Sequence, residues 1–146
     1  MELYGYRLEN TRRYFVPLNI HIPQFNISKP ITFLVDTGCE TTNINPFDSM
    51  YNLDIYSSIR NMEPTTRSIT AACVTVDDVV LKDCALYYYG PNRLVQYEKL
   101  DRIYVSRMEI NEANRKNIMS IPSPLGMDFL ERYEIRFVGS RIILEK

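Results

Sequence analysis

The chain has 146 residues, of which 45% are hydrophobic and 24% are charged, and its formal net charge is −1. A chain of this size is expected to fold as one domain, residues 1–146, with enough apolar side chains for a substantial core. A nearly neutral charge provides no basic surface for nucleic acid or for an anionic membrane, so the sequence predicts neither partner.

The cysteines and the apolar segments bear on the compartment. Cys39, Cys73 and Cys84 are an odd number without a C-x-x-C pair, which argues against a disulfide framework and against a zinc site. The first 13 residues lack the apolar centre of a signal peptide, and no run reaches the roughly 18 apolar residues of a membrane helix. The sequence therefore predicts a cytoplasmic protein.

Two strands are predicted near the start of the chain. Tyr14–Ile22 alternates apolar and polar residues, which is typical of a half-buried strand. Pro17 inside it indicates either an edge strand or a ladder position that needs no N–H. The turn formers of Pro23–Pro30 predict a wide hairpin that leads into Ile31–Val35, whose continuous apolar run indicates a buried strand.

The buried strand ends in Asp36-Thr37-Gly38. This order places a carboxylate on a tight loop at the edge of an apolar interior. Burial there disfavours the charged form, so we expect Asp36 to be poised for proton transfer. Taken alone, the tripeptide is better interpreted as a strand that ends in a capped turn, because Asp and Gly are ordinary turn residues.

The rest of the chain predicts further strands and few helices. Asn45-Pro46 resembles a helix start, with a short helical turn over Phe47–Tyr51, while Asn52–Met62 is expected to be irregular. Glu109–Met119 is either a weakly amphipathic helix or a surface excursion. Other predicted elements are strands within Ser68–Leu81, Cys84–Tyr89, Leu94–Met108, Tyr133–Phe137 and Arg141–Lys146, and a helix over Gly126–Tyr133. The fold class is all-β with one or two short helices.

Two motifs resemble the signatures of retropepsin-like aspartic proteases. Asp36-Thr37-Gly38 on a hydrophobic strand, with Thr42 and Ile44 downstream, resembles the active-site loop of that family. Pro124-Leu125-Gly126-Met127-Asp128-Phe129-Leu130 resembles the second signature, in which glycine leads into a short helix with an acid near its start. The resemblance implies a closed retropepsin-like β-barrel, the half-domain of an acid protease, active as a two-fold dimer.

The chemistry of this family makes the dimer a requirement. Peptide hydrolysis uses two carboxylates that share one proton, and the chain contains Asp-Thr-Gly only once. A homodimer brings Asp36 to its symmetry mate across a two-fold axis. The predicted activity is that of an aspartic endopeptidase, which hydrolyses peptides or unfolded protein without a metal or cofactor.

The resemblance also implies roles for neighbouring residues. Thr37 would form hydrogen bonds across the dimer axis, and Gly38 would let the backbone approach the carboxylate and the substrate. Structural support would come from Thr42, Gly126 and Asp128, with a hydrogen bond between Thr42 and Asp128. The expected substrate-binding residues are Glu40, Thr41, Asn43, Ala71, Ala72, Cys73 and Val74.

The sequence departs from the family pattern at three places, two in the Asp36 loop and one in the expected flap. Cys39 stands where Ala or Ser is usual, and Asn43 replaces a commonly apolar residue, which should make the substrate pocket more polar. Ser68–Leu81 should supply the flap that closes over bound peptide, but it contains no glycine. The tip is therefore either Ala71-Ala72-Cys73 or a turn at Asp77-Asp78, and it should be stiffer than a glycine-containing tip.

Two other functions are alternatives to proteolysis. One is a catalytically weak or inactive member of the family that uses the same groove to bind peptides or a partner protein. Another is a thiol enzyme with Cys39 as nucleophile and His21 as base, although a lone histidine on the polar face of a strand is more often solvated. The carboxylates of Glu40, Asp77 and Asp78 have no recurring metal-ligand spacing.

Overall fold

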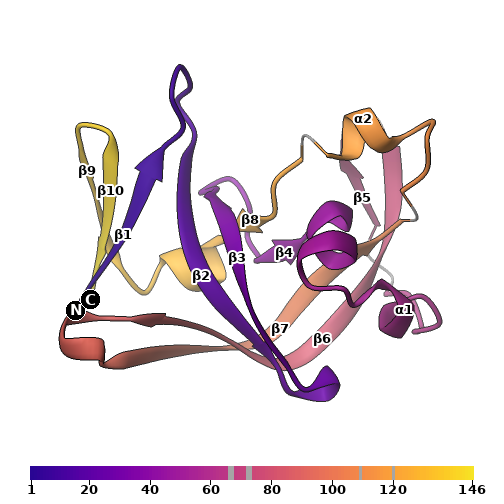
Figure 1. Cartoon of the computed structure of the whole chain (residues 1–146), viewed down its shortest axis with the longest axis horizontal. Coiled ribbons are helices and arrows are strands. Elements are labelled where there is room, and N and C mark those ends of the chain that lie inside the picture. The colour runs from indigo at the N-terminus through magenta and orange to yellow at the C-terminus, as the bar shows by residue number, and fades with distance from the viewer. Residues whose placement is uncertain (66–67, 72–73, 109, 120) are drawn as a thin grey trace.

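The computed structural model describes residues 1–65, 68–71, 74–108, 110–119 and 121–146. Within them the chain forms a ten-stranded sheet and a few short helical turns (Figure 1). The strands are β1 (Glu2–Arg7), β2 (Tyr14–Ile22), β3 (Ile27–Val35), β4 (Asn43–Ile44), β5 (Ser68–Ala71), β6 (Val74–Tyr89), β7 (Val95–Arg107), β8 (Pro124–Leu125), β9 (Glu134–Val138) and β10 (Arg141–Glu145). The α-helices are α1 (Tyr56–Ile59), α2 (Arg115–Ile118) and α3 (Met127–Leu130), and other helical turns cover Pro23–Phe25, Asp48–Asn52 and Pro91–Arg93. A mostly β fold with short helices was predicted from the sequence.

The β2–β3 hairpin is narrower than the sequence predicted. Ile22 pairs with Ile27, and a single 3-10 turn, Pro23–Phe25, connects the two strands. The turn ends at Asn26, whose φ of 52° lies in the left-handed region that asparagine tolerates better than most residues. The chain therefore reverses within a few residues, and β3 starts before Ile31.

Pro17 marks the place where β2 changes partners. Along one side β2 pairs with β3, and Pro17 lies opposite Thr32. On the other side Tyr14 and Phe15 pair with β1, whereas Asn19–His21 pairs with β6. Pro17 lies between these two pairings, at a position where no N–H is needed. β2 is therefore not an edge strand, and Pro17 occupies a ladder position without an N–H hydrogen bond.

The change of partner divides the sheet and leaves it open. From β4 the strand order is β4-β7-β6-β2-β1-β10-β9, and β3 joins β2 to β8. Among the described strands β4 and β9 do not pair with each other, so the pairings do not form the closed barrel that the sequence predicted. In Figure 1, β1, β10 and β9 rise on one side while the long β6–β7 hairpin runs beneath β2 and β3.

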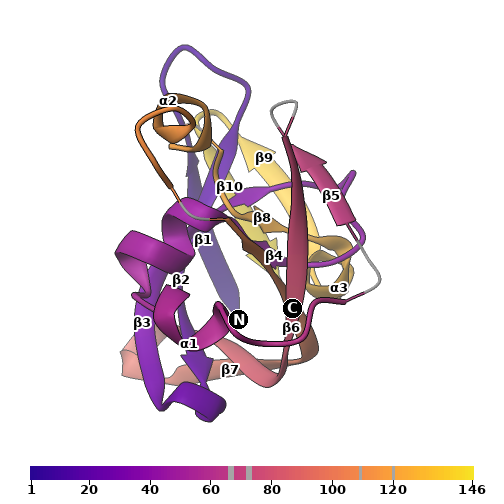
Figure 2. The same cartoon turned by 90° about the vertical axis from the view of Figure 1, so that its right-hand side faces the viewer.

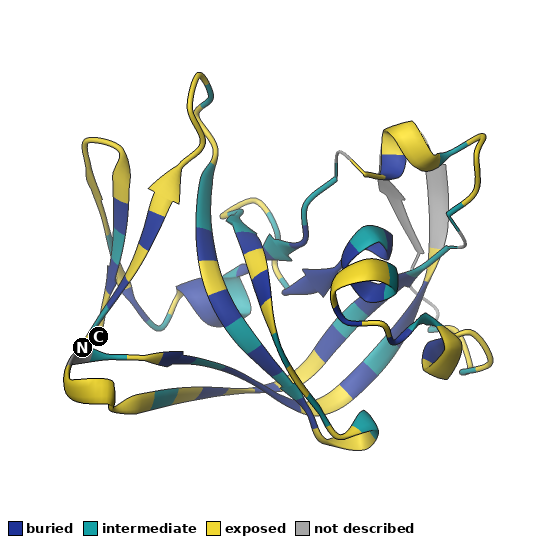
Figure 3. Cartoon of the chain, viewed as in Figure 1, coloured by how far each residue is buried: buried dark blue, intermediate teal, exposed yellow. Residues whose placement is uncertain are grey.

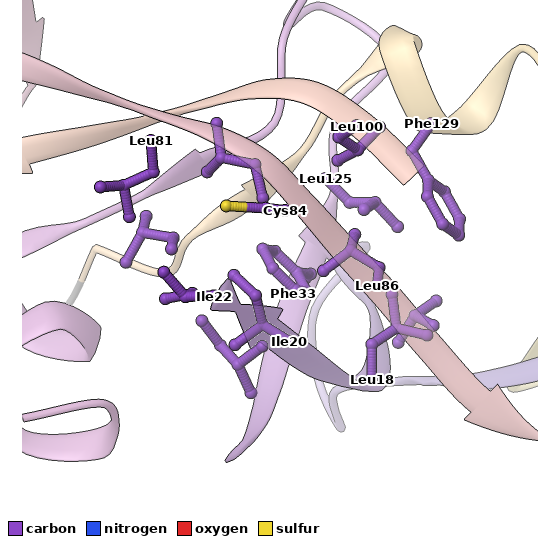
Figure 4. Close-up of a cluster of buried hydrophobic side chains, with 14 of the residues drawn as sticks. Leu18, Ile20, Ile22, Phe33, Leu81, Cys84, Leu86, Leu100, Leu125 and Phe129 are labelled. Atoms are coloured by element: carbon purple, nitrogen blue, oxygen red, sulfur yellow. The ribbon is translucent and has the colours of Figure 1, made fainter. Parts of the chain in front are cut away.

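The core lies between the strands and follows the period of two in the sequence. Val16, Leu18, Ile20 and Ile22 of β2 are buried, while Pro17 between them is exposed, an alternation that Figure 3 shows along β2 and β3. These side chains pack with apolar residues from other elements, including Phe33, Leu81, Leu86, Leu125 and Phe129 (Figure 4). Full burial of each such side chain contributes about 1.5–3 kcal/mol.

Two helical segments differ from the sequence expectation. The turn after Asn45-Pro46 is present as Asp48–Asn52, but the Asn45 side chain does not cap it and donates instead to the Pro122 carbonyl at 2.6 Å. The segment expected to be irregular contains α1. The Arg107 guanidinium on β7 donates to the carbonyl groups at the end of this helix, those of Ile59, Arg60 and Met62. The Ile59 carbonyl also accepts from the Met62 N–H at 3.0 Å. A short helix leaves most of its last carbonyls without an intrahelical partner, and here a distant cation supplies donors to them.

The expected flap is the β5–β6 hairpin. Its register runs from Ser68 opposite Asp77 to Ala71 opposite Val74. The connection between Ala71 and Val74 consists of Ala72 and Cys73, which lie outside the described residues. Asp77 and Asp78 are in the interior of β6, so a turn at Asp77-Asp78 is wrong. Figures 1 and 2 show this hairpin at the same end of the molecule as α2.

The described chain contains no helix of the length and apolarity needed to cross a membrane.

Glu98 connects β7 to the C-terminal part of the chain. It is only 5% exposed, and its carboxylate accepts hydrogen bonds from the Tyr133 hydroxyl at 2.8 Å, Lys146 Nζ at 2.7 Å and the Arg132 guanidinium at 3.0 Å. Burial opposes the charge, but the hydrogen bonds from Lys146, Tyr133 and Arg132 outweigh it and hold the pKa of Glu98 below its ordinary value. Its ionised form therefore stabilises the fold.

Glu98→Gln tests this contribution. We expect the free energy of unfolding at pH 7 to fall by about 2 kcal/mol, because two cations and a buried hydroxyl lose their carboxylate. The pKa of Glu98 is lower in the folded state than in the unfolded state. The stability that its carboxylate provides is therefore complete above the ordinary glutamate pKa of about 4.3, and it is lost as the pH falls through the pKa of Glu98 in the folded protein. Urea unfolding from pH 7 downward should show that the difference in unfolding free energy between the variant and wild type narrows below about pH 4.

Glu134→Gln, at an exposed position of β9, is the control and should leave stability unchanged. A gap independent of pH would contradict the role of Glu98.

Candidate active site

Asp36 follows directly after β3 and lies on a tight turn. Its backbone N–H donates to the Leu125 carbonyl on β8 at 3.2 Å, and its carbonyl accepts from the Cys39 N–H at 3.1 Å. Its carboxylate Oδ1 accepts a hydrogen bond of 3.0 Å from the Gly38 N–H. The Asp36 side chain is half-buried, whereas Thr37 and Gly38 are exposed. The carboxylate is thus fixed in position at the surface end of a core strand.

The loop is anchored to the second motif through Thr42, which is fully buried. The Thr42 N–H lies 2.9 and 3.0 Å from the two carboxylate oxygens of Asp128, and its hydroxyl donates to Asp128 Oδ1 at 2.7 Å. The same hydroxyl accepts from the Gly126 N–H at 3.1 Å. The hydrogen bond that the family resemblance implied between Thr42 and Asp128 is therefore present.

The start of α3 adds two backbone bonds to this anchor. Met127 N–H donates to the Cys39 carbonyl at 2.8 Å, and Asp128 N–H donates to the Glu40 carbonyl at 3.0 Å. Gly126 is what allows this approach, since a Cβ there would lie 2.4 Å from the carbonyl carbon of Thr41. No side chain fits against backbone at that distance, so glycine is required by the contact itself.

Asn43 and Cys39 form a small polar cluster inside the loop. Asn43 is 2% exposed, and its amide Nδ2 donates to the Thr41 carbonyl at 2.6 Å and to Cys39 Sγ at 3.3 Å. The Cys39 thiol in turn donates to the Thr41 carbonyl at 3.1 Å. The Asn43 side chain is therefore directed at the backbone of its own loop.

The other residues predicted from the sequence fall into two groups. Glu40 is exposed and Thr41 half-buried on the same loop, so the structure brings them together with Asp36 and with Gly126 and Asp128. Ala71 and Val74 close the pairing of the β5–β6 hairpin, a separate element, and Ala72 and Cys73 lie outside the described residues.

The alternative thiol dyad is wrong. His21 pairs with Ser28 near the turn of the β2–β3 hairpin, and its ring Nδ1 lies 2.8 Å from the Ser28 hydroxyl oxygen. Cys39 follows the opposite end of β3. The extended strand between Ser28 and Asp36, at about 3.3 Å per residue, is roughly 25 Å long, so the His21 and Cys39 side chains do not meet.

A second buried polar cluster was not anticipated. The fully buried Ser123 hydroxyl accepts from the Asn45 N–H at 2.9 Å and donates to the Asp48 carboxylate, while the Ser123 carbonyl accepts from the Leu34 N–H at 2.9 Å. This cluster holds the segment before β8 against the end of β3, close to Asp36. No sequence spacing indicates this contact, because Asn45 and Ser123 are far apart in the chain. Among the described residues no group of three or more His, Cys, Asp and Glu side chains could hold a metal ion.

Comparison with known proteins supports the fold. No protein-family model and no curated protein sequence matches the chain. Its structure is similar to the crystal structure of a retropepsin-like aspartic protease from Rickettsia conorii, with a TM-score of 0.59 over 99% of this chain and 89% of that one. The fold is retropepsin-like. The two sequences are 18% identical.

Within this retropepsin-like fold, Thr42→Val tests the anchor of the Asp36 loop. The substitution keeps the shape of the side chain but removes the hydroxyl that bonds Asp128 and Gly126, and it leaves the Gly126 N–H buried without that acceptor. We expect a loss of about 2 kcal/mol in the free energy of unfolding, measured by urea denaturation. Thr32→Val, at an exposed position of β3, is the matched control and should change stability by less than about 0.5 kcal/mol. Equal effects of the two substitutions would contradict the proposed anchor.

Proposed function

We propose that this protein is an aspartic endopeptidase that acts as a homodimer, with one Asp36 carboxylate contributed by each subunit. The observation that carries the proposal is the position of Asp36. Its carboxylate lies on a tight loop at the end of a core strand, in a retropepsin-like fold, and the loop is anchored by Thr42 to Gly126 and Asp128.

A single chain provides half of the chemistry. Hydrolysis of a peptide bond by carboxylates requires one to act as general base on the attacking water and another to donate a proton to the carbonyl oxygen. Two such groups about 3 Å apart share one proton, since like charges at that distance do not both ionise. The sequence contains Asp-Thr-Gly once, and a two-fold axis next to the exposed Thr37 and Gly38 would supply the second carboxylate.

The substrate would be a peptide or an unfolded protein segment in an extended conformation. In the proposed dimer it would lie across the two Asp36 loops, in reach of Glu40 and Thr41, whereas the buried Asn43 side chain braces the loop from within. The β5–β6 hairpin, whose described pairing ends with Ala71 opposite Val74, would close over it. The mechanism uses a water and two carboxylates, and it requires no metal or organic cofactor.

Asp36→Asn tests the catalytic role. We expect the rate of peptide hydrolysis at mildly acidic pH to fall at least about a thousandfold, because an amide neither accepts the proton of the water nor shares one with its partner. Asp101→Asn on β7 removes an exposed carboxylate and should retain full activity. Cleavage of an unfolded protein, followed by mass spectrometry, gives the readout. Binding of a statine-containing peptide with no cleavage at any pH would instead establish a binding module without catalysis.

Subunit mixing tests whether the site is shared. Wild-type chain is kept at a fixed amount and is mixed with an equal amount of Asp36→Asn chain until the subunits have exchanged. With random pairing, a quarter of the dimers then contain two intact chains. Because the number of dimers doubles, activity should fall to about half. Unchanged activity, or an active monomer in sedimentation, would show that each chain acts alone.

A further inference from the structure

A cavity of about 520 Å³ lies outside the Asp36 loop. It is bounded by the end of β1, the β1–β2 connection, the middle of β3, the helical turn Asp48–Asn52 and the segment before β8. Its described lining includes no residue of the loop 36–43. The volume falls within the range of about 300–1,000 Å³ that is usual for small-molecule sites in proteins.

The charge at this cavity is one-sided. Arg13 lines it and is exposed, and within the described chain its guanidinium forms no hydrogen bond or ion pair. The acidic residue in the described lining, Asp48, is only 7% exposed. Its two carboxylate oxygens accept hydrogen bonds from Ser123 and Asn52. The charged group available to a ligand in this lining is therefore the Arg13 guanidinium, which has five N–H donors and no acceptor.

Apolar side chains form part of the remaining walls. Leu8, Phe15 and Phe47 line the cavity, and Leu8 is 46% exposed. Apolar side chains left accessible around a concave site stabilise an apolar group that is transferred from water. A ligand complementary to the whole cavity therefore has an apolar body and an anionic end.

We propose that this cavity binds a small amphipathic carboxylate, with the carboxylate on the Arg13 guanidinium and the apolar body against Leu8, Phe15 and Phe47. The planar fork of arginine matches a carboxylate through two parallel hydrogen bonds, which a neutral alcohol does not reproduce. The site uses no residue of the Asp36 loop, so it does not depend on the proposed proteolysis.

Adjacent Arg12 provides a matched control. It lines a different depression, together with Arg7, Tyr14 and Phe137. Removing either arginine changes the net charge equally, so a general electrostatic attraction would respond to both substitutions alike. A bound carboxylate at this cavity responds to Arg13 alone.

The experiment is isothermal titration calorimetry at pH 7 with octanoate and with 1-octanol as the neutral probe. We expect wild type and Arg12→Gln to bind octanoate about tenfold more tightly than 1-octanol, and Arg13→Gln to lose this preference. Asp36→Asn should bind octanoate as wild type does, which separates this proposal from the proposed function.

A second variant tests the location of the site. Thr32 is an exposed residue of β3 in the cavity lining, so the larger side chain of Thr32→Trp should fill the cavity. Both probes should then bind at least about tenfold more weakly. A thermal unfolding measurement checks that the variant is folded. The proposal is overturned if octanoate and 1-octanol bind equally, if Arg12→Gln and Arg13→Gln have the same effect, or if neither probe binds wild type at millimolar concentration.

Discussion

The hydrogen bonds between Thr42, Asp128 and Gly126 are the constraint on which the candidate active site depends. The Asp36 loop begins with exposed residues that bury little apolar surface, so packing alone does not offset the entropy of ordering it. A carboxylate that accepts from both an N–H and a hydroxyl gives stronger bonds than neutral groups do, and here Thr42 supplies both donors. Since Thr42 is fully buried, any rearrangement of the loop would leave these polar groups without partners.

A second constraint is the change of partners along β2. Pro17 offers no N–H at the point where β1 ends its pairing and β6 has not yet begun. One side of the sheet continues through β1 to β10 and β9, and the other through β6 to β7 and β4. β3 pairs with β2 along its whole length, so the strand that carries Asp36 is held at the junction of the two halves. Its position is thereby coupled to both parts of the molecule.

The sequence predicted those features that depend on local pattern. The alternation of Tyr14–Ile22 marked β2 with its bounds as found, because a period of two is unambiguous when one face is buried. The Asp-Thr-Gly and Gly-Met-Asp motifs indicated the two segments that meet at the loop. The closing strands on either side of Gly139-Ser140 were also apparent, as a tight turn separates two alternating runs.

The features that the sequence did not predict depend on contacts between distant residues. α1 is stabilised at its end by Arg107, which lies nearly 50 residues further along the chain, and nothing in the Asn52–Met62 segment signals this. Asn45 was interpreted as a helix cap because capping is its local preference, yet its amide bonds the Pro122 carbonyl. The open sheet likewise follows from strand pairing, which no single segment determines.

The two departures from the family pattern in the Asp36 loop, Cys39 and Asn43, explain each other. A buried amide in place of an apolar side chain costs free energy unless its donors are satisfied. Here the Asn43 amide donates to the Thr41 carbonyl and to the sulfur of Cys39, so the polar group is satisfied inside the loop. Asn43 was expected to make a substrate pocket more polar, but in the single chain its side chain is buried and braces the loop backbone. Asn43 and Cys39 therefore add a further connection within the loop that carries Asp36, whose carboxylate accepts from the Gly38 N–H.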